Sequence, residues 1–172
     1  MMPKIGLMAD SHGRVTTTRR AVELLIGHGA TTLVHLGDVG SLQVLDELVA
    51  ANPQGGGFVE SHVVFGNCDW DTTALGRYAA DLGLKVDHPV GTLSFGGRDL
   101  AFLHGHDTRA MAKILARDVQ WLCHGHSHCQ RDERSGKTRI INPGALFRAH
   151  PHSVALLETD SDDLAFYSLG SD

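Results

Sequence analysis

The 172-residue sequence predicts an α/β (α+β) fold in which two mixed β-sheets pack together and are flanked by helices. Two observations predict it. In the first half, short apolar runs bounded by turn residues alternate with helical patterns, which is typical of a sheet with crossover helices. In the second half, most apolar runs follow one another without a helix between them, which favours hairpins. We expect a single domain over residues 1–172, because a chain of this length supports one core.

The first half contains three strands and two helices in alternation. Apolar runs predict strands over residues 4–9, 31–36 and 62–65. Helical patterns over residues 16–29 and 41–52 fill the intervals, and Ser41 is an acceptable N-cap for the second helix. The glycine-rich segment 54–58 is expected to be a flexible loop. The pattern of residues 69–92 is interpreted as a short helix or a loop.

The second half is mostly strand. Further strands are predicted over residues 100–103, 119–123, 137–142, 153–159 and 164–169. A helix over residues 107–118, with Asp107 or Thr108 as its cap, separates the first two of these strands. Two hairpins are expected, one turning at Gly96–Gly97 and one at residues 160–163.

Composition excludes several classes of protein. The net charge is −5 and the pI about 6.1, so we expect no stable nucleic-acid binding, which needs many cations at phosphates. No apolar run approaches the roughly 18 residues that span a membrane, and the apolar run that opens the chain is too short for a signal peptide. Three cysteines are too few for a disulfide scaffold. We therefore expect a cytoplasmic protein without a membrane partner.

Five apolar runs each end in residues that bind metal ions. The residues are Asp10, His12, Asp38, Asn67, His104, His126 and His128. The carboxyl ends of strands in open α/β sheets meet at one edge, which predicts that these side chains lie together. Because seven ligands exceed the four or so of a single zinc ion, the set suits two ions. Two divalent ions, two carboxylates and a bridging hydroxide leave one positive charge, which attracts phosphate.

The segment WLCHGHSHCQ at residues 121–130 raises the alternative of a structural zinc site. Cys123 and Cys129 do not follow the paired spacing of such sites, so we interpret them as a packed side chain and an exposed thiol. His124 is interpreted as a packed or supporting residue. The segment is therefore expected to form one edge of a reaction site.

The motifs DSH, GD, GNCD, HGH and GHSH occur in that order, with NPG at residues 142–144. In this order they resemble the five motifs of the calcineurin-like metallophosphoesterases, and most of all the small YfcE- and MJ0936-like phosphodiesterases. The resemblance covers nearly the whole chain. It implies a four-layer fold, a β-sandwich with flanking helices.

By motif position, the resemblance implies which residues hold each metal. Asp10, His12 and His128 would hold the first ion, Asp38 would bridge, and Asn67, His104 and His126 would hold the second. The cofactors are expected to be two divalent ions, Mn²⁺ first, with Fe, Zn, Ni or Co as alternatives.

The resemblance also implies a metal-dependent phosphodiesterase, in which a metal-bridging hydroxide attacks phosphorus in line. The substrate is expected to be a small phosphorylated molecule. Asn67 would belong to the catalytic set, but Cys68 stands where many family members have a histidine that protonates the leaving group. Asp69 and His106 are therefore the candidates for the general acid, and substrates whose leaving group needs little protonation are favoured.

Other functions stay open. The chain could be a non-catalytic scaffold that resembles the retromer subunit Vps29, or a phosphomonoesterase or nuclease of the same superfamily. The complete ligand set speaks against the scaffold, and the acidic chain has no room for a DNA-binding domain. A homodimer is possible, because relatives often pair.

Overall fold

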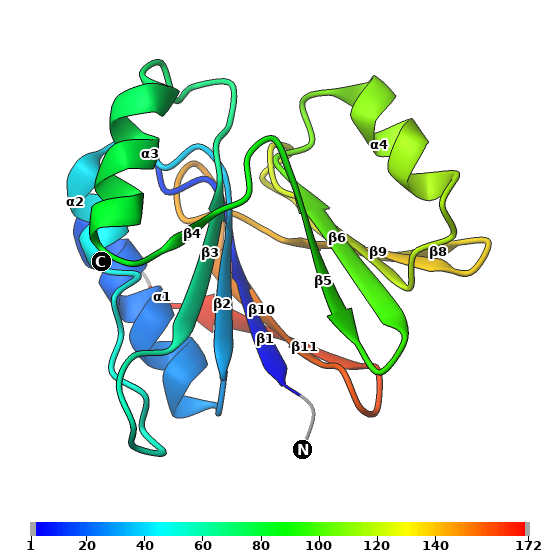
Figure 1. The fold of residues 1–172 in the computed structure, drawn as a ribbon, viewed down its shortest axis with the longest axis horizontal. Coiled ribbons are helices and arrows are strands. Elements are labelled where there is room, and N and C mark those ends of the chain that lie inside the picture. The colour runs from blue at the N-terminus through cyan, green and yellow to red at the C-terminus, as the bar shows by residue number, and fades with distance from the viewer. Residues whose placement is uncertain (1–2, 171–172) are drawn as a thin grey trace.

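The computed structural model describes residues 3–170, which form two β-sheets packed face to face (Figure 1). The larger sheet has six strands in the order β11-β10-β1-β2-β3-β4, and the smaller has five in the order β5-β6-β7-β9-β8. The six are β1 (Lys4–Met8), β2 (Thr32–Leu36), β3 (Glu60–Val64), β4 (Lys85–Val86), β10 (His152–Glu158) and β11 (Asp163–Leu169). The five are β5 (Val90–Phe95), β6 (Arg98–Leu103), β7 (Trp121–Cys123), β8 (Gln130–Ser135) and β9 (Thr138–Pro143).

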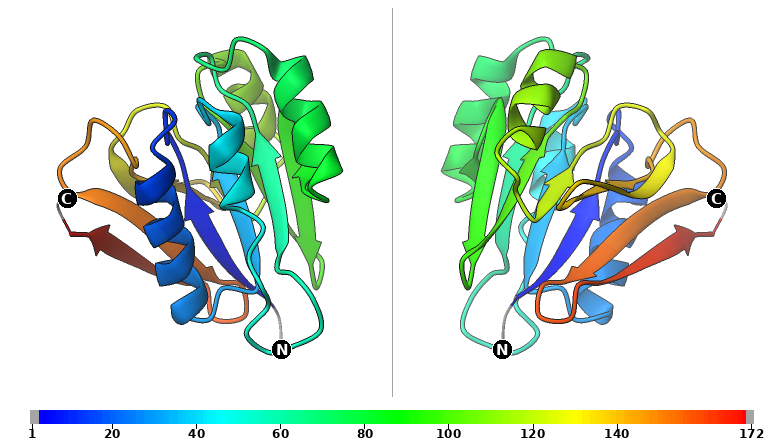
Figure 2. Two further views of the ribbon diagram at one scale, coloured as in Figure 1. Left: turned by 90° about the vertical axis from the view of Figure 1, so that its left-hand side faces the viewer. Right: turned by 90° about the vertical axis from the view of Figure 1, so that its right-hand side faces the viewer.

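Helices cover the outer face of each sheet, as Figures 1 and 2 show. The helices are α1 (Val15–Gly27), α2 (Leu42–Asp46), α3 (Thr72–Asp81) and α4 (Thr108–Leu115). The first three lie on the six-stranded sheet and α4 lies on the five-stranded sheet. The resulting order of layers is helix, sheet, sheet, helix, which confirms the predicted fold class.

The core between the sheets explains why the strands read as continuous apolar runs. Ile5 and Leu7 of β1 face Phe102 and Trp121 of the five-stranded sheet and are fully buried. The alternate residues of β1 face the helices, where a side chain at Gly6 would meet Leu25 and its neighbours. A strand buried on both faces needs apolar residues at every position.

Two differences from the sequence-based expectations have physical causes, and the structure resolves one expectation that the sequence leaves open. The strand β8 was not predicted, because its sequence QRDERS is polar and exposed, and it is held by pairing with β9. The helix expected over 41–52 ends at Asp46, because the amides of Leu48 and Val49 bond three residues back. The ambiguous segment 69–92 contains α3, whose N-cap Asp71 accepts a hydrogen bond from the amide of Ala74.

The topology brings five strand ends to one edge of the molecule. Strands β1, β2 and β3 run parallel, and so do β6 and β7. The predicted hairpins are confirmed, with β5 and β6 joined at Gly96–Gly97 and β10 paired with β11. None of the helices among residues 3–170 has the length and apolarity that crossing a membrane requires.

Candidate metal centre

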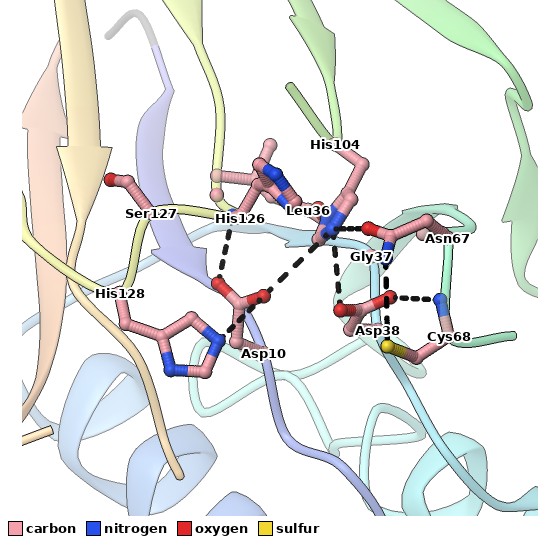
Figure 3. Close-up of polar contacts among 12 residues, drawn as sticks. Asp10, Leu36, Gly37, Asp38, Asn67, Cys68, His104, His126, Ser127 and His128 are labelled. Atoms are coloured by element: carbon pink, nitrogen blue, oxygen red, sulfur yellow. Dashed lines mark hydrogen bonds and ion pairs between the residues drawn. The ribbon is translucent and has the colours of Figure 1, made fainter. Parts of the chain in front are cut away.

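The loops after β1, β2, β3, β6 and β7 bring all seven predicted ligands into one cluster. Figure 3 shows Asp10, Asp38, Asn67, His104, His126 and His128 converging from these loops. His12 belongs to the same cluster, since its ring nitrogen lies 3.4 Å from Oδ2 of Asp38. The expectation from the strand ends is therefore correct as to position.

The turns that carry these residues hold an uncommon backbone conformation. Asp10, His12, Asp38, His126 and His128 all have positive φ, between 43° and 69°. Side chains other than glycine rarely adopt this conformation, and functional sites concentrate it. Two backbone hydrogen bonds lock the first two turns together, from the amide of Asp10 to the carbonyl of Gly37 and from His12 to Asp38.

Two glycines let these turns approach closely. A Cβ at Gly66 would lie 2.0 Å from Oδ1 of Asp38, and a Cβ at Gly37 would lie 2.6 Å from Nδ1 of His104. Gly37 also has a φ of +95°. The glycines of the GD and GNCD motifs are thus required by the space that the acidic and imidazole side chains occupy.

The two carboxylate oxygens of Asp10 have different environments. Oδ2 accepts a hydrogen bond of 3.0 Å from the amide of His126. Oδ1 is buried and has no hydrogen-bond partner among the described residues. It lies 3.4 Å from Nε2 of His128 and 3.9 Å from Nε2 of His104. Burial, partly offset by these imidazoles, raises the pKa of Asp10 to about 6.

Asp38 lies at the middle of the cluster. Its Oδ1 accepts a hydrogen bond of 2.8 Å from the amide of Cys68, and its Oδ2 lies 3.3 Å from Nε2 of His104. Burial alone would raise the pKa of Asp38, but these contacts and the His12 imidazole outweigh burial and lower it. Asp38 is therefore ionised at neutral pH.

His104 directs one nitrogen into the cluster. Its Nδ1 lies 2.8 Å from the carbonyl of Leu36, which can only accept, so Nδ1 carries a proton. Nε2 then faces oxygens, with Oδ1 of Asn67 at 3.1 Å and Oδ2 of Asp38 at 3.3 Å. Burial alone would lower the pKa of His104, but the Asp38 contact outweighs it and raises the pKa. Either a proton or a metal ion satisfies this arrangement of atoms.

The other imidazoles are suited to bind metal in their neutral form. Nε2 of His12 is buried without a hydrogen-bond partner among residues 3–170. Burial lowers the pKa of His12 and of His126. A neutral imidazole offers the electron pair that a metal needs.

Three sets of ligand atoms lie within 4.8 Å of one another. They are Asp10–His12–His128, Asp10–Asp38–His104 and His12–Asp38–Cys68. The sets share Asp10, His12 and Asp38, so neighbouring ions would share ligands. The unpartnered Asp10 Oδ1 and His12 Nε2, together with a donor set of mixed nitrogen and oxygen, fit transition-metal ions.

The two candidates for the general acid lie in different surroundings. The carboxylate of buried Asp69 accepts hydrogen bonds from the amides of Gly66, Val39 and Gly40, at 2.8, 3.1 and 2.9 Å. It therefore ties the turn after β2 to the turn after β3. The ring of His106 is exposed, and its centroid lies 5.5 Å from that of His104 and 6.2 Å from that of His126.

The place of Cys68 among the ligand atoms, and the presence of Phe147 and Arg148 at the site, were not expected from the sequence. Cys68 places its sulfur among the ligand atoms. Phe147 and Arg148 line a hollow of about 400 Å³ with His12, Asp38 and His126. The segment ALFR at 145–148 contains no ligand-type residue, and the only nearby signal was the preceding NPG.

A further layer of residues supports the ligands. Buried His35 lies 2.6 Å from Oγ of Ser11 through Nε2, and its Nδ1 accepts from the amide of Gly37. It thus connects the turn of Asp10 to the turn of Asp38. Burial lowers the pKa of His35 to about 3, so this residue stays neutral.

The segment 121–130 is an edge of this cluster. His126 and His128 face it, whereas Cys123 is buried and Cys129 is exposed. His124 is buried, and Nδ2 of Asn142 lies 3.4 Å from its Nδ1. Cys123 and Cys129 take no part in the ligand sets found among the described residues.

Comparison with known proteins agrees with this geometry. The model of the calcineurin-like phosphoesterase superfamily domain matches residues 3–162. The phosphodiesterase MJ0936 of Methanocaldococcus jannaschii is 27% identical over 167 residues, 93% of this chain and 95% of that protein. The phosphodiesterase YfcE of Escherichia coli K12 is 29% identical over 171 residues, 92% of this chain and 89% of that protein.

Solved structures share the fold. An archaeal phosphodiesterase superposes with a TM-score of 0.83 at 22% identity and covers 96% of this chain and 99% of its own. Vps29 of Entamoeba histolytica, solved with Zn²⁺, superposes with a TM-score of 0.64 at 21% identity and covers 95% of this chain and 90% of its own. At these identities the structures establish the fold alone, while the family match spans most of the sequence. The chain belongs to the calcineurin-like phosphoesterase superfamily.

Proposed function

We propose that this protein is a metal-dependent phosphodiesterase. The observation that carries the proposal is the unpartnered pair of buried ligand atoms, Asp10 Oδ1 and His12 Nε2, within one cluster of carboxylates and imidazoles. Buried polar atoms without partners are rare unless a ligand or an ion satisfies them. The relatives MJ0936 and YfcE, both named phosphodiesterases, support the same reaction class.

Two divalent ions, Mn²⁺ first among them, are the cofactors that the cluster would hold. Asp10, His12 and His128 would hold one ion, Asn67, His104 and His126 would hold the other, and Asp38 would lie between them. When bound, such ions lower the pKa of water and neutralise the charge that develops on phosphoryl oxygens during in-line attack by hydroxide. Iron, zinc, nickel and cobalt suit the same donors.

The side chains of the site divide the remaining work. Asn67 turns its amide oxygen toward Nε2 of His104, and its Nδ2 donates one hydrogen bond of 3.6 Å to Sγ of Cys68. The second N–H of this amide can contact a phosphoryl oxygen. Asp69 is a positioning residue, because its carboxylate is occupied by three backbone amides. Exposed His106 is therefore the better candidate to deliver a proton to the leaving group.

The test of the proposal is Asp38→Asn, assayed on bis(p-nitrophenyl) phosphate with added Mn²⁺. The change keeps the shape of the side chain and removes the charge between the two metal positions. We expect turnover to fall by about a hundredfold or more, with an unchanged circular dichroism spectrum. Full activity in this variant would refute the assignment.

A scaffold comparable to Vps29 is the second candidate, and the shared fold is the observation that favours it. The two functions are distinguished by measuring whether the metal-loaded protein hydrolyses a phosphate ester. A scaffold would bind metal without hydrolysing any phosphate ester, whereas a phosphodiesterase turns over the bis(p-nitrophenyl) ester when it is loaded.

Three further expectations concern the surroundings of the reaction, and the acidic charge of the chain supports the last of them. We propose a small phosphorylated substrate, a cytoplasmic location and no stable binding to nucleic acid. Titration of labelled DNA at low salt tests the last point, since binding through phosphates is strongest there. Sedimentation of the metal-loaded protein tests for the possible homodimer.

A further inference from the structure

A second hollow adjoins the metal centre on the side of the loop between β9 and β10. It has a volume of about 490 Å³ and shares His128 and Arg148 with the hollow over the metal ligands. A ligand seated on the metal ligands could therefore extend past Arg148 into this second space. Together the two hollows have the size of an ordinary small-molecule site.

The second hollow is built to receive negative charge. Arg148, His150, Gln130 and Ser127 contribute donors to its wall, and no carboxylate lines it. The Oγ of Ser127 accepts from Nδ2 of Asn142, which leaves its own proton available to a ligand.

Arg148 is available to bind an anion. Four other arginines are engaged with carboxylates, namely Arg19, Arg131, Arg134 and Arg139. Within residues 3–170 no carboxylate pairs with Arg148 or with Arg14. Both guanidiniums instead lie near the ring of Phe147, 5.1 Å and 4.6 Å from its centroid. The ring holds the two cations at the rim of the metal centre, because cations bind to aromatic faces.

The hollow on the Cys68 side of the metal centre lacks the cationic residues that line the Arg148 side. A hollow of about 270 Å³ that also borders Cys68 is lined by Asp69, Asp71 and the exposed residue Trp70. Its lining includes two acidic residues and no Arg, Lys or His, so it offers an anion no cationic partner. A phosphodiester has two arms, and the charged arm is therefore directed toward Arg148.

We propose that the Arg148 hollow is a subsite for a second phosphoryl group, so that the substrate class is phosphodiesters that carry an additional phosphate on the non-leaving arm. The inference rests on the proposed phosphodiesterase function. A guanidinium binds a phosphate through two parallel hydrogen bonds, which gives both strength and orientation. Arg148 then sets which diesters are preferred, while the metal ligands carry out the hydrolysis.

The experiment compares two esters with the same leaving group. They are the p-nitrophenyl ester of thymidine monophosphate and the same ester with a second phosphate on the far sugar hydroxyl. The readout is the ratio of their kcat/KM values with Mn²⁺ present. In wild type we expect the doubly phosphorylated ester to be preferred, and in Arg148→Gln the ratio should fall by about tenfold, as for one charge-assisted hydrogen bond.

Arg117→Gln is the matched control. Arg117 is exposed and precedes β7, at the opposite end of that strand from the metal ligands. Its loss should leave the ratio unchanged. Arg148→Glu should lower the ratio further than Arg148→Gln does, because a carboxylate repels the second phosphate. The preference of wild type should weaken as salt rises.

The outcomes separate the inference from the proposed function. An unchanged ratio in Arg148→Gln, or an equal loss on both esters, would overturn the inference while the phosphodiesterase stands. If wild type hydrolyses neither ester, the proposed function fails. Calorimetry then compares the affinities for thymidine bisphosphate and thymidine monophosphate, which tests whether the subsite exists. Weaker binding of the bisphosphate by Arg148→Gln would support it, and equal binding by both proteins would overturn it.

Discussion

The amide of His126 donates a hydrogen bond of 3.0 Å to Oδ2 of Asp10, across 116 positions of sequence. The bond holds the carboxylate so that its other oxygen, Oδ1, turns toward the imidazoles of His128 and His104 (Figure 3). One oxygen thus fixes the geometry, and the other is kept for a metal ion. Without a metal ion, the ionised carboxylate of Asp10 is buried and its Oδ1 has no hydrogen-bond partner among the described residues, which destabilises the folded state.

The first prediction concerns Asp10→Asn in chelated protein. The pKa of Asp10 is raised from 3.8 to about 6 in the folded state, so ionising it opposes folding. This penalty is absent below about pH 4, grows as the pH rises through 6 and stays at its full value above. At about pH 8 we expect the substitution to raise the free energy of unfolding by on the order of 2–3 kcal/mol and to abolish metal binding. Thermal unfolding at about pH 8 and about pH 5 measures the difference.

Asp163→Asn is the control for this prediction, because Asp163 is exposed at the start of β11. It should change stability by only a few tenths of a kcal/mol at either pH. A loss of stability in metal-free Asp10→Asn at about pH 8 would contradict the interpretation that ionised Asp10 destabilises the fold when no metal ion is bound.

The second prediction concerns Gly66→Ala. The added Cβ would lie 2.0 Å from Oδ1 of Asp38, so the carboxylate must move from its place between the imidazoles. We expect metal affinity to fall by about tenfold or more. Gly76→Ala in α3 is the matched control, since its Cβ would have no neighbour nearer than 3.8 Å. That control should bind metal normally and gain about 0.5–1 kcal/mol from the higher helix propensity of alanine. Isothermal titration with Mn²⁺ measures both affinities, and equal values would refute the steric argument.

The third prediction concerns the support given by His35. Its folded pKa of about 3 lies below the unfolded value of 6.5, so the folded state binds fewer protons. The contribution of neutral His35 is present above about pH 6.5 and is lost as the pH falls toward 3. His35→Leu breaks the contacts to Ser11 and Gly37, and we expect it to cost about 1–3 kcal/mol at neutral pH. The difference between wild type and His35→Leu should shrink in acid. Urea unfolding across this range tests it, and a constant difference would exclude the linkage.

The fourth prediction separates His106 from Asp69. His106→Asn should slow the hydrolysis of esters with poor leaving groups more than that of p-nitrophenyl esters. It should leave stability unchanged, because the ring is exposed. Asp69→Asn replaces one of the two oxygens that accept from three backbone amides with an NH2 donor, and it should lower stability together with turnover on every ester. A leaving-group series with unfolding curves distinguishes them. Equal slowing of all esters by His106→Asn would exclude it as the general acid.

The sequence predicts the fold correctly wherever burial of a segment leaves a run of apolar residues. The runs around Ile5, Val34 and Phe102 are buried on both faces and were predicted as strands. The strand β8 was not, because Asp132 and most of its neighbours are exposed; β8 pairs with β9, and Arg139 of β9 forms an ion pair with Asp132. β8 forms a hairpin with the adjacent β9 around Gly136, but a polar, exposed edge strand has no apolar alternation to detect.

The sequence also predicts most residues of the candidate site. The ligands follow strand ends, and the rule for parallel strands places them together. Phe147 and Arg148 were not predicted because the loop after β9 carries no ligand-type residue, although β9 runs parallel to β7 and ends at the same edge. Phe147 packs on His12, with ring centroids 5.2 Å apart. Contacts of that kind are set by tertiary structure and have no spacing to detect.

The most direct test of the central claim is to count the metal and the turnover in the same sample. Protein stripped with a chelator is reloaded with Mn²⁺, bound metal is measured by mass spectrometry, and hydrolysis of bis(p-nitrophenyl) phosphate is followed. We predict two ions per chain, with turnover restored in proportion to loading. Stripped protein that takes up no metal, or two bound ions without any hydrolysis, would contradict the assignment of this site as a phosphodiesterase centre.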